Sequence, residues 1–180
     1  FMEVAALTDG EIVNYSNIAS DCGVKSNTIK EYFSILEDTL VGYMVPAYNK
    51  SLKRKEVQAP KFYYFDVGIA NYLLYRKELQ RGTPEYGHAF EHFVIQEIIA
   101  YLGYKNSDEK LSYWHTYTGN EVDAIIGNRV AIEIKSADMV QPKHLKGLRA
   151  FAEEYPNFDR MIVSWDPINR KTEDGIQIIF

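Results

Sequence analysis

Three charged residues interrupt two short apolar runs between residues 120 and 136, in the stretch NEVDAIIGNRVAIEIKS. Asp123 lies inside the first run, and Glu133 and Lys135 lie inside the second. The runs have the length and composition of paired β-strands, separated by turn-forming residues. Charged side chains within such strands indicate either a solvent-facing side or a functional site.

The pairing of the two runs decides where these charges lie. A two-residue turn at Gly127 and Asn128 would place Asp123 opposite Ile132, so that both faces would mix charge with apolar residues. One additional loop residue instead creates a face that is wholly apolar. Because a slip of one residue moves every side chain to the opposite face, burial favours this second register. The sequence therefore predicts Asp123 opposite Glu133, with Lys135 on the same side. On the apolar face it predicts Val122, Ala124, Ile132 and Ile134.

Two carboxylates that face each other across a strand pair repel, and such like-charge pairs are destabilising. A divalent cation between Asp123 and Glu133 would offset the repulsion, because hard oxygen ligands suit Mg²⁺ or Mn²⁺. Lys135 would then stabilise negative charge that develops on a phosphate, or assist the attacking water. The alternative is a surface ion triad without function.

Secondary-structure signals on either side of this hairpin predict an α/β sandwich with a central mixed sheet. Residues 88–104 form a predicted amphipathic helix with Phe90, Val94, Ile98 and Tyr101 on one stripe and Glu91 beside it. Residues 142–154 form a second predicted helix. The predicted strands are 111–118, 121–126, 130–136, 160–165 and 176–180.

The first half of the chain predicts a helix-turn-helix. Within residues 16–37, Ser16 and Ser26 are candidate helix caps, and Gly23 suits a left-handed helix end. A shared apolar core is predicted from Ile18, Ala19, Val24, Ile29, Phe33 and Leu36. Strands at 41–48 and 61–66 and a helix at 67–75 follow. A polar connector near residue 80 predicts two domains, 1–79 and 80–180.

The loop between the two strands of the first half is basic, with Lys50, Lys53, Arg54 and Lys55. Such a loop resembles the wing of a winged helix and could contact DNA phosphates. The second helix carries Lys25 and Lys30 but also three acidic residues, which suits a phosphate-lined groove poorly. DNA contact and a role in protein packing therefore both remain open for this half.

Composition limits the classes of protein to consider. The 180 residues are 46% hydrophobic with a net charge of −5, so a globular fold is expected and any attraction to DNA must be local. The single cysteine, Cys22, fits a reducing cytoplasm and a buried apolar role in a helix. No run approaches the roughly 20 apolar residues of a membrane span. We therefore expect a cytoplasmic protein without a membrane partner.

The order of Glu91 on a helix, Asp123 on a strand and Glu133-Ile134-Lys135 on the next strand resembles the PD-(D/E)XK nuclease superfamily. In that resemblance Glu91, Asp123 and Glu133 hold the metal ion. Val122 stands where the classical proline precedes the aspartate, and His115 stands where relatives carry arginine.

Nearly the whole chain also resembles the C-terminal half of a prokaryotic AAA+ ATPase family, through the phrases FYYFDVGIANYLL, GHAFEHFVIQEI and AIEIKS. This resemblance implies a winged helix followed by a nuclease-like domain. It also implies an N-terminal P-loop ATPase domain outside this chain, which has no G-x-x-x-x-G-K-[ST] motif of its own.

Two functions compete on these grounds. The first is a metal-dependent DNA nuclease domain attached to an ATPase, favoured by the complete set of carboxylates and lysine. The second is a DNA- or protein-binding module that regulates the ATPase without catalysis, favoured by the acidic net charge and the weakly basic second helix. Fold alone does not decide between them.

Overall fold

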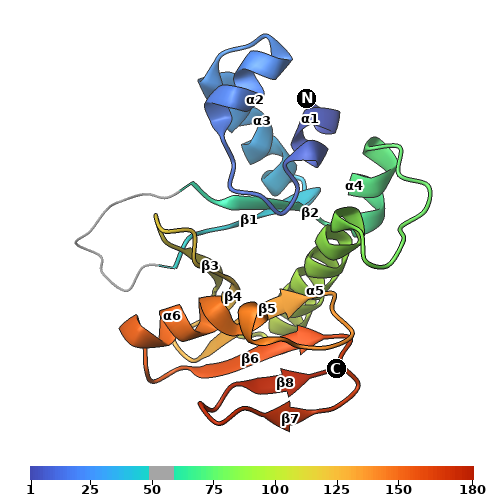
Figure 1. Ribbon diagram of the computed structural model, residues 1–180. Helices are drawn as coiled ribbons and strands as arrows, with labels where there is room; N and C mark the ends of the chain where they lie inside the picture. The colour runs from blue at the N-terminus through green and yellow to red at the C-terminus, as the bar shows by residue number, and fades with distance from the viewer. Residues whose placement is uncertain (49–58) are drawn as a thin grey trace. The chain divides into compact units, whose positions relative to one another are not determined.

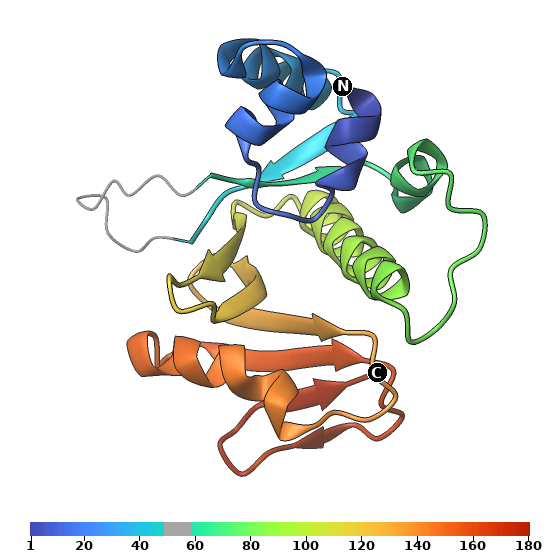
Figure 2. The same cartoon turned by 45° about the horizontal axis from the view of Figure 1, so that its top comes forward.

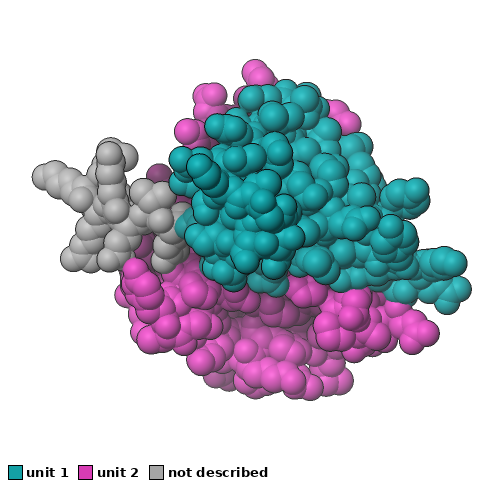
Figure 3. Space-filling model, turned by 90° about the horizontal axis from the view of Figure 1, so that it is seen from above, with its two compact units in different colours: residues 1–46, 57–79 teal, residues 47–56, 80–180 magenta. Residues whose placement is uncertain are grey.

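The chain folds into two compact units, each with its own apolar core (Figure 3). The computed structural model describes residues 1–48 and 59–180. Unit 1 comprises Phe1–Pro46 and Val57–Leu79, and unit 2 comprises Ala47–Glu56 and Gln80–Phe180. Helices and strands occur in both, so the chain is a mixed α/β protein.

Unit 1 consists of helices around one antiparallel strand pair (Figure 1). Its elements are α1 (Met2–Leu7), α2 (Tyr15–Cys22), α3 (Ser26–Asp38), β1 (Gly42–Val45), β2 (Lys61–Tyr64) and α4 (Val67–Leu73). Asn14, rather than Ser16, caps α2 by accepting a hydrogen bond from the backbone N–H of Asn17 at 3.1 Å. Ser26 is the first helical residue of α3 and not its cap. Gly23 ends α2 in the predicted left-handed conformation, with a φ of 66°.

The core of unit 1 contains Ile18, Ala19, Ile29, Phe33 and Leu36, as predicted. Val24 is the exception, since its side chain is 37% exposed. Its backbone N–H bonds to the carbonyl oxygen of Ala19 in the turn that closes α2. The side chain therefore leaves the apolar stripe that the helical spacing predicts.

Unit 2 contains a six-stranded mixed sheet in the order β3-β4-β5-β6-β8-β7. Strands β5, β6 and β8 run parallel, and the remaining neighbours are antiparallel. The elements are α5 (Pro84–Tyr104), β3 (Leu111–His115), β4 (Glu121–Ile126), β5 (Val130–Lys135), the 3₁₀ helix η1 (Pro142–Leu145), α6 (Lys146–Glu154), β6 (Asp159–Ser164), β7 (Arg170–Lys171) and β8 (Gln177–Ile179). The predicted central mixed sheet is confirmed.

Helix α5 begins four residues before the predicted start at His88. The Thr83 hydroxyl accepts a hydrogen bond from the backbone N–H of Tyr86 at 3.3 Å, and Pro84 fits the first helical position. Tyr101, predicted on the buried stripe, is 58% exposed. The apolar residues of α5 therefore extend around the helix rather than forming one stripe.

Two helices cover the sheet on opposite faces, with α6 in front and α5 behind in Figure 1, and the turned view of Figure 2 shows the two helices apart from each other. The core beneath α6 includes Leu148 and Phe151 of the helix with Ile125, Ala131 and Ile162 of the strands. Among the described residues, no helix has the length and apolar character that crossing a membrane requires.

Candidate functional site

Strands β4 and β5 pair in the predicted register. Ala124 lies opposite Ile132, and Ile126 lies opposite Val130. The connecting loop therefore has three residues, with Gly127 at a positive φ of 53°. The carboxylates of Asp123 and Glu133 come together at the end of this pairing, where both contact the Lys135 ammonium.

The regular pairing of β4 with β5 ends at Ala124, one residue from Asp123. The carboxylate of Asp123 there accepts a hydrogen bond at 2.7 Å from the backbone N–H of Ile134. Val122 belongs to the same apolar cluster as Ile125, although the two are three positions apart. The strict alternation of faces is thus broken at Asp123, and the prediction that Val122 points away with Ala124 is wrong.

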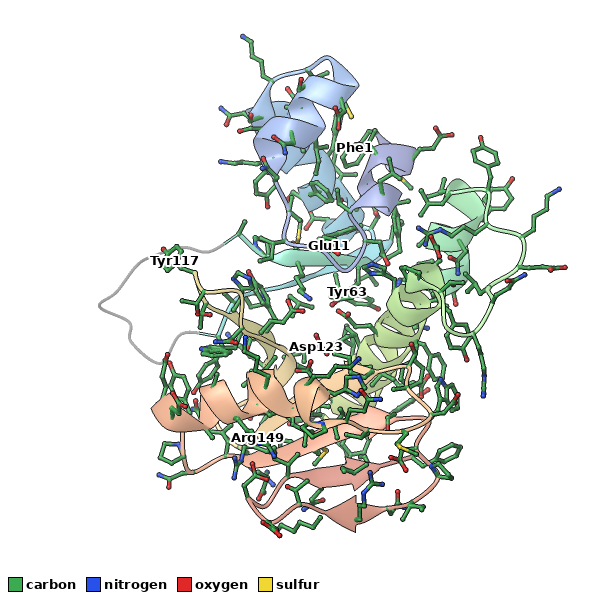
Figure 4. The ribbon with its side chains drawn as sticks, in the orientation of Figure 1. Phe1, Glu11, Tyr63, Tyr117, Asp123 and Arg149 are labelled. Atoms are coloured by element: carbon green, nitrogen blue, oxygen red, sulfur yellow. The ribbon has the colours of Figure 1, made fainter. Side chains whose placement is uncertain are left out.

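Both carboxylates are buried, with Asp123 1% and Glu133 4% exposed (Figure 4 labels Asp123). The Lys135 ammonium lies 2.8 Å from Glu133 Oε1 and 3.4 Å from Asp123 Oδ2, with one third of its side chain exposed. The alternative of a surface ion triad is therefore wrong. The site is a buried pair of carboxylates that form ion pairs with a partly solvent-exposed lysine.

Burial raises the pKa of Glu133 well above its ordinary value, and the nearby Asp123 carboxylate raises it further against the opposing effect of Lys135. Burial lowers the pKa of Lys135, but Asp123 and Glu133 outweigh this and the net shift is upward. Lys135 consequently stays protonated at neutral pH and can stabilise negative charge, whereas it cannot take a proton from water.

Helix α6 approaches this pair at Gly147. A Cβ atom at Gly147 would overlap the carbonyl oxygen of Glu121 and would lie 3.3 Å from Glu133 Oε2. Within the described part of the chain, Glu133 Oε2 is buried and has no hydrogen-bond partner. A carboxylate oxygen in that position is destabilising unless something binds it.

Glu91 lies on α5 and is half-buried. One turn before it, the Cβ position of Gly87 is 3.5 Å from the hydroxyl of Ser136, just beyond Lys135. Glu91 also contributes to the raised pKa of Lys135. It is therefore within electrostatic reach of the site. The described residues nevertheless include no group of three or more histidine, cysteine or acidic side chains able to hold a metal ion.

The predicted DNA-contacting residues lie elsewhere. Lys25 and Lys30 are exposed at the beginning of α3 in unit 1. The Lys30 ammonium lies 5.6 Å from the centre of the Tyr15 ring. The basic loop residues Lys50, Lys53, Arg54 and Lys55 fall outside the described residues.

Family comparison matches residues 86–179, which include the whole acidic pair and its lysine, to a domain of unknown function, DUF4143. The chain belongs to the DUF4143 family. A second family model, the domain of unknown function DUF8612, matches residues 1–80.

Two uncharacterised proteins, one from Mycobacterium bovis and one from Mycobacterium tuberculosis, are each 27% identical over 132 residues. The match covers 70% of this chain but 29% of each relative, so the chain spans less than a third of the length of these curated relatives. No solved structure matches.

The DUF4143 segment contains further site residues that sequence reasoning missed. Gly147 permits the close approach of α6, and only three-dimensional contact reveals this role. His144 in η1 accepts a hydrogen bond on Nδ1 from the backbone N–H of Gln141 at 3.1 Å. Burial, Lys143 and Lys135 all lower the His144 pKa, which places the imidazole within reach of the lysine of the site. Its position eleven residues after Glu133 carries no recognisable spacing signal.

Proposed function

We propose that unit 2 is a PD-(D/E)XK nuclease-like domain that hydrolyses phosphodiester bonds of DNA with the help of Mg²⁺ or Mn²⁺. The observation that carries the proposal is the buried acidic pair, in which Glu133 Oε2 has no hydrogen-bond partner among the described residues. Acids with raised pKa values beside a specific charge partner are typical of functional sites. The order of helix, hairpin and following helix around the pair supports the same assignment.

The residues present fit a divalent cation of the hard type. Mg²⁺ is commonly held by one or two carboxylates, with water and substrate phosphate completing its octahedron. Asp123 and Glu133 supply two carboxylates from neighbouring strands. Glu91 is a candidate third ligand, or a ligand through water. The bound cation would polarise the phosphate and lower the pKa of a bound water.

The protein groups then have separate roles in hydrolysis. A water oxygen bonds to phosphorus and gives up a proton to solvent, a bridging P–O bond breaks, and the departing oxygen takes up a proton from solvent. Asp123 and Glu133 would hold the cation, and the close packing of α6 at Gly147 fixes the position of the Glu133 carboxylate. The Lys135 ammonium stabilises the negative charge that develops on the phosphate oxygens.

The surrounding protein in this proposal is a prokaryotic AAA+ ATPase, with its P-loop domain outside this chain. The small share of the mycobacterial relatives that the chain spans is compatible with such an arrangement. In unit 1, helices α2 and α3 followed by the β1–β2 pair support a winged helix. That unit would bind DNA or a protein partner.

A second candidate function is a regulatory DNA- or protein-binding module that retains the nuclease fold without catalysis. The observation that favours it is the ion pairing of Lys135 with both carboxylates, which partly neutralises them without a metal ion. The net charge of −5 also weakens general attraction to DNA.

The deciding experiment measures Mn²⁺ binding by calorimetry and Mg²⁺- or Mn²⁺-dependent nicking of branched and linear DNA. Glu133→Ala should lose both metal binding and cleavage. Lys135→Ala should keep the metal but lose cleavage by about 100-fold or more, as when one preorganised charge stabiliser is removed. Glu153→Gln, which changes an exposed acid of α6, is the matched control and should behave as wild type.

The same measurements separate the two functions. Wild-type protein that binds DNA but binds no divalent cation and cuts none of these substrates would exclude the nuclease and leave the regulatory module. Cleavage that survives Glu133→Ala would place the chemistry elsewhere.

A further inference from the structure

The segment that covers the acidic pair has the opposite charge balance to the rest of the chain. Between Asp138 and Glu153 the sequence has no acidic residue, although acids outnumber lysine and arginine 25 to 20 overall. Lys143, Lys146 and Arg149 are exposed at three-residue intervals along η1 and α6. Arg149 is held by Asp174 through an N–O contact of 2.7 Å, whereas no ion pair is found for Lys143 or Lys146 in the described residues.

This basic segment lies next to the candidate site. Gly147, the neighbour of Lys146, has its Cβ position 3.3 Å from Glu133 Oε2. His144, the neighbour of Lys143, is within electrostatic reach of Lys135. Each of the two lysines is therefore the sequence neighbour of a residue that lies close to the candidate site.

The local backbone holds the two lysines in place. A reciprocal capping box joins Gln141 and His144, and Pro142 fits the first position of η1. Lys146 is the first residue of α6, and the N-terminal end of a helix carries partial positive charge. The segment thus combines two exposed ammonium groups with a rigid start and a favourable helix dipole.

We propose that Lys143 and Lys146 form a phosphate-binding track that holds the DNA backbone beside the phosphate placed at Asp123 and Glu133. The inference rests on the nuclease-like function proposed above and names its substrate contact. An acidic protein partner would also satisfy the lysines, and a chain that binds no DNA in the test below would favour such a partner. A phosphodiester instead suits both the lysines and a cation held by that pair.

The test measures binding of a short fluorescein-labelled DNA duplex to the full chain by fluorescence anisotropy, in EDTA, across a range of salt concentrations. Each lost phosphate contact lowers the slope of log affinity against log salt by about 0.9. The double variant Lys143→Gln/Lys146→Gln should therefore lower the slope by about 1.8 and weaken binding at low salt.

The matched control is Lys105→Gln/Lys110→Gln, which removes two exposed lysines of unit 2 between α5 and β3. Its slope should stay at the wild-type value. Equal slopes for wild type and the Lys143/Lys146 variant, or equal losses in both double variants, would overturn the track. Unchanged thermal unfolding of each variant verifies that only the surface charge has changed.

Because no cation or cleavage is needed, this result is independent of catalysis. A wild type that binds through Lys143 and Lys146 but never cuts supports the track and defeats the nuclease. A wild type that cuts DNA with an unaltered slope in the Lys143/Lys146 variant defeats the track alone.

Discussion

Glu133 lies in an environment that is unfavourable for a carboxylate. Its carboxylate is nearly fully buried, faces a second acid and pairs with Lys135 through Oε1. Burying a charge is costly unless it is paired and hydrogen-bonded. Glu133 thus combines a stabilising ion pair at Oε1 with an unsatisfied oxygen at Oε2, and this contrast distinguishes it from the exposed acids of the chain.

A second unfavourable residue lies outside the site, at the end of α3. Leu40 has a positive φ of 59°, and the backbone N–H groups of Leu40 and Val41 bond to the carbonyl oxygens of Glu37 and Leu36. This is the Schellman arrangement, in which glycine is the preferred residue. Leucine is strained there by roughly 1 kcal/mol.

Leu40→Gly should therefore raise the free energy of unfolding by about 0.5–1 kcal/mol, since the strain is larger than the added backbone entropy. Urea denaturation measures the change. Gly23→Ala makes the reverse change at the left-handed end of α2, and it should lower the free energy of unfolding by a similar amount. A destabilised Leu40→Gly would show that the exposed leucine makes contacts that outweigh its strain.

The Asp166 carboxylate accepts four hydrogen bonds, and the one from Val140 joins two loops. Its carboxylate bonds bidentately to Arg170, each contact at 2.9 Å, and accepts from the backbone N–H groups of Val140 and Ile168. The hydrogen bonds from Arg170, followed by that from Val140, lower the pKa of Asp166 well below its ordinary value. The loop that leads from β5 to η1 is fixed in this way to the loop after β6.

A lowered pKa stabilises the folded chain above the ordinary aspartate pKa, and this contribution is lost as the pH falls toward the folded value. Asp166→Asn should therefore unfold more easily at pH 7, and its deficit should shrink as the pH falls below about 4. Thermal unfolding at several pH values measures this. Asp138→Asn, in an exposed pair with Arg81, should show little deficit at any pH. A pH-independent deficit for Asp166→Asn would contradict the linkage.

At the scale of elements, the sequence predicts the strands of the site well, because apolar alternation and the three-residue loop admit one favourable register. The structure confirms the pairing of Ala124 with Ile132. Val122 does not lie on the predicted face of the sheet. The alternation of faces breaks where the Asp123 carboxylate accepts a hydrogen bond from the backbone N–H of Ile134. Side-chain competition for a backbone donor leaves no mark on hydrophobic periodicity.

Elements whose position depends on distant contacts were also beyond prediction. β7 has two residues and exists only through its pairing with β8. The predicted helix 142–154 divides into η1 and α6, and the contact of Gly147 with Glu121 joins residues 26 positions apart in the sequence. The acidic pair was therefore predictable from local sequence, whereas the helix that buries it was not.

The approach of α6 to β4 depends on a residue without a side chain. Gly147→Ala would introduce a Cβ that overlaps the Glu121 carbonyl, so the helix must shift outward. Such overpacking should lower the free energy of unfolding by about 1–3 kcal/mol, measured by urea denaturation.

Gly103→Ala is the matched control, because a Cβ at that position of α5 meets no atom within 4 Å. It should stabilise the chain by up to about 1 kcal/mol through helix propensity. A neutral Gly147→Ala would show that α6 moves away from β4 without cost.

At the scale of the whole molecule, the two units do not follow each other simply along the chain. Ala47 and Tyr48 belong to unit 2 although unit 1 continues with β2. The Tyr48 backbone N–H donates to Tyr113 O at 2.6 Å, and its hydroxyl bonds to Asn128 at 2.8 Å. Its ring also packs edge-on against Phe151, Tyr155 and Phe158.

Tyr48→Ala should consequently destabilise unit 2 by roughly 2 kcal/mol, below the about 3–5 kcal/mol of a fully buried aromatic residue. Hydrogen exchange of β4 and β5 amides measures the effect. Tyr72→Ala, at an exposed position of α4, should leave this exchange unchanged. Equal protection of the β4 and β5 amides in Tyr48→Ala and wild type would show that Tyr48 does not stabilise unit 2.

The interleaved path of the chain at Tyr48 also restricts how these units can be recombined. A single crossover at residue 80 would transfer the sheet and both of its helices, but would leave behind the aromatic ring that packs on Phe151. A grafted copy of unit 2 would therefore need two junctions, or a substitute aromatic residue from its new neighbour. Inheritance of the two units as one block is the arrangement that this topology favours.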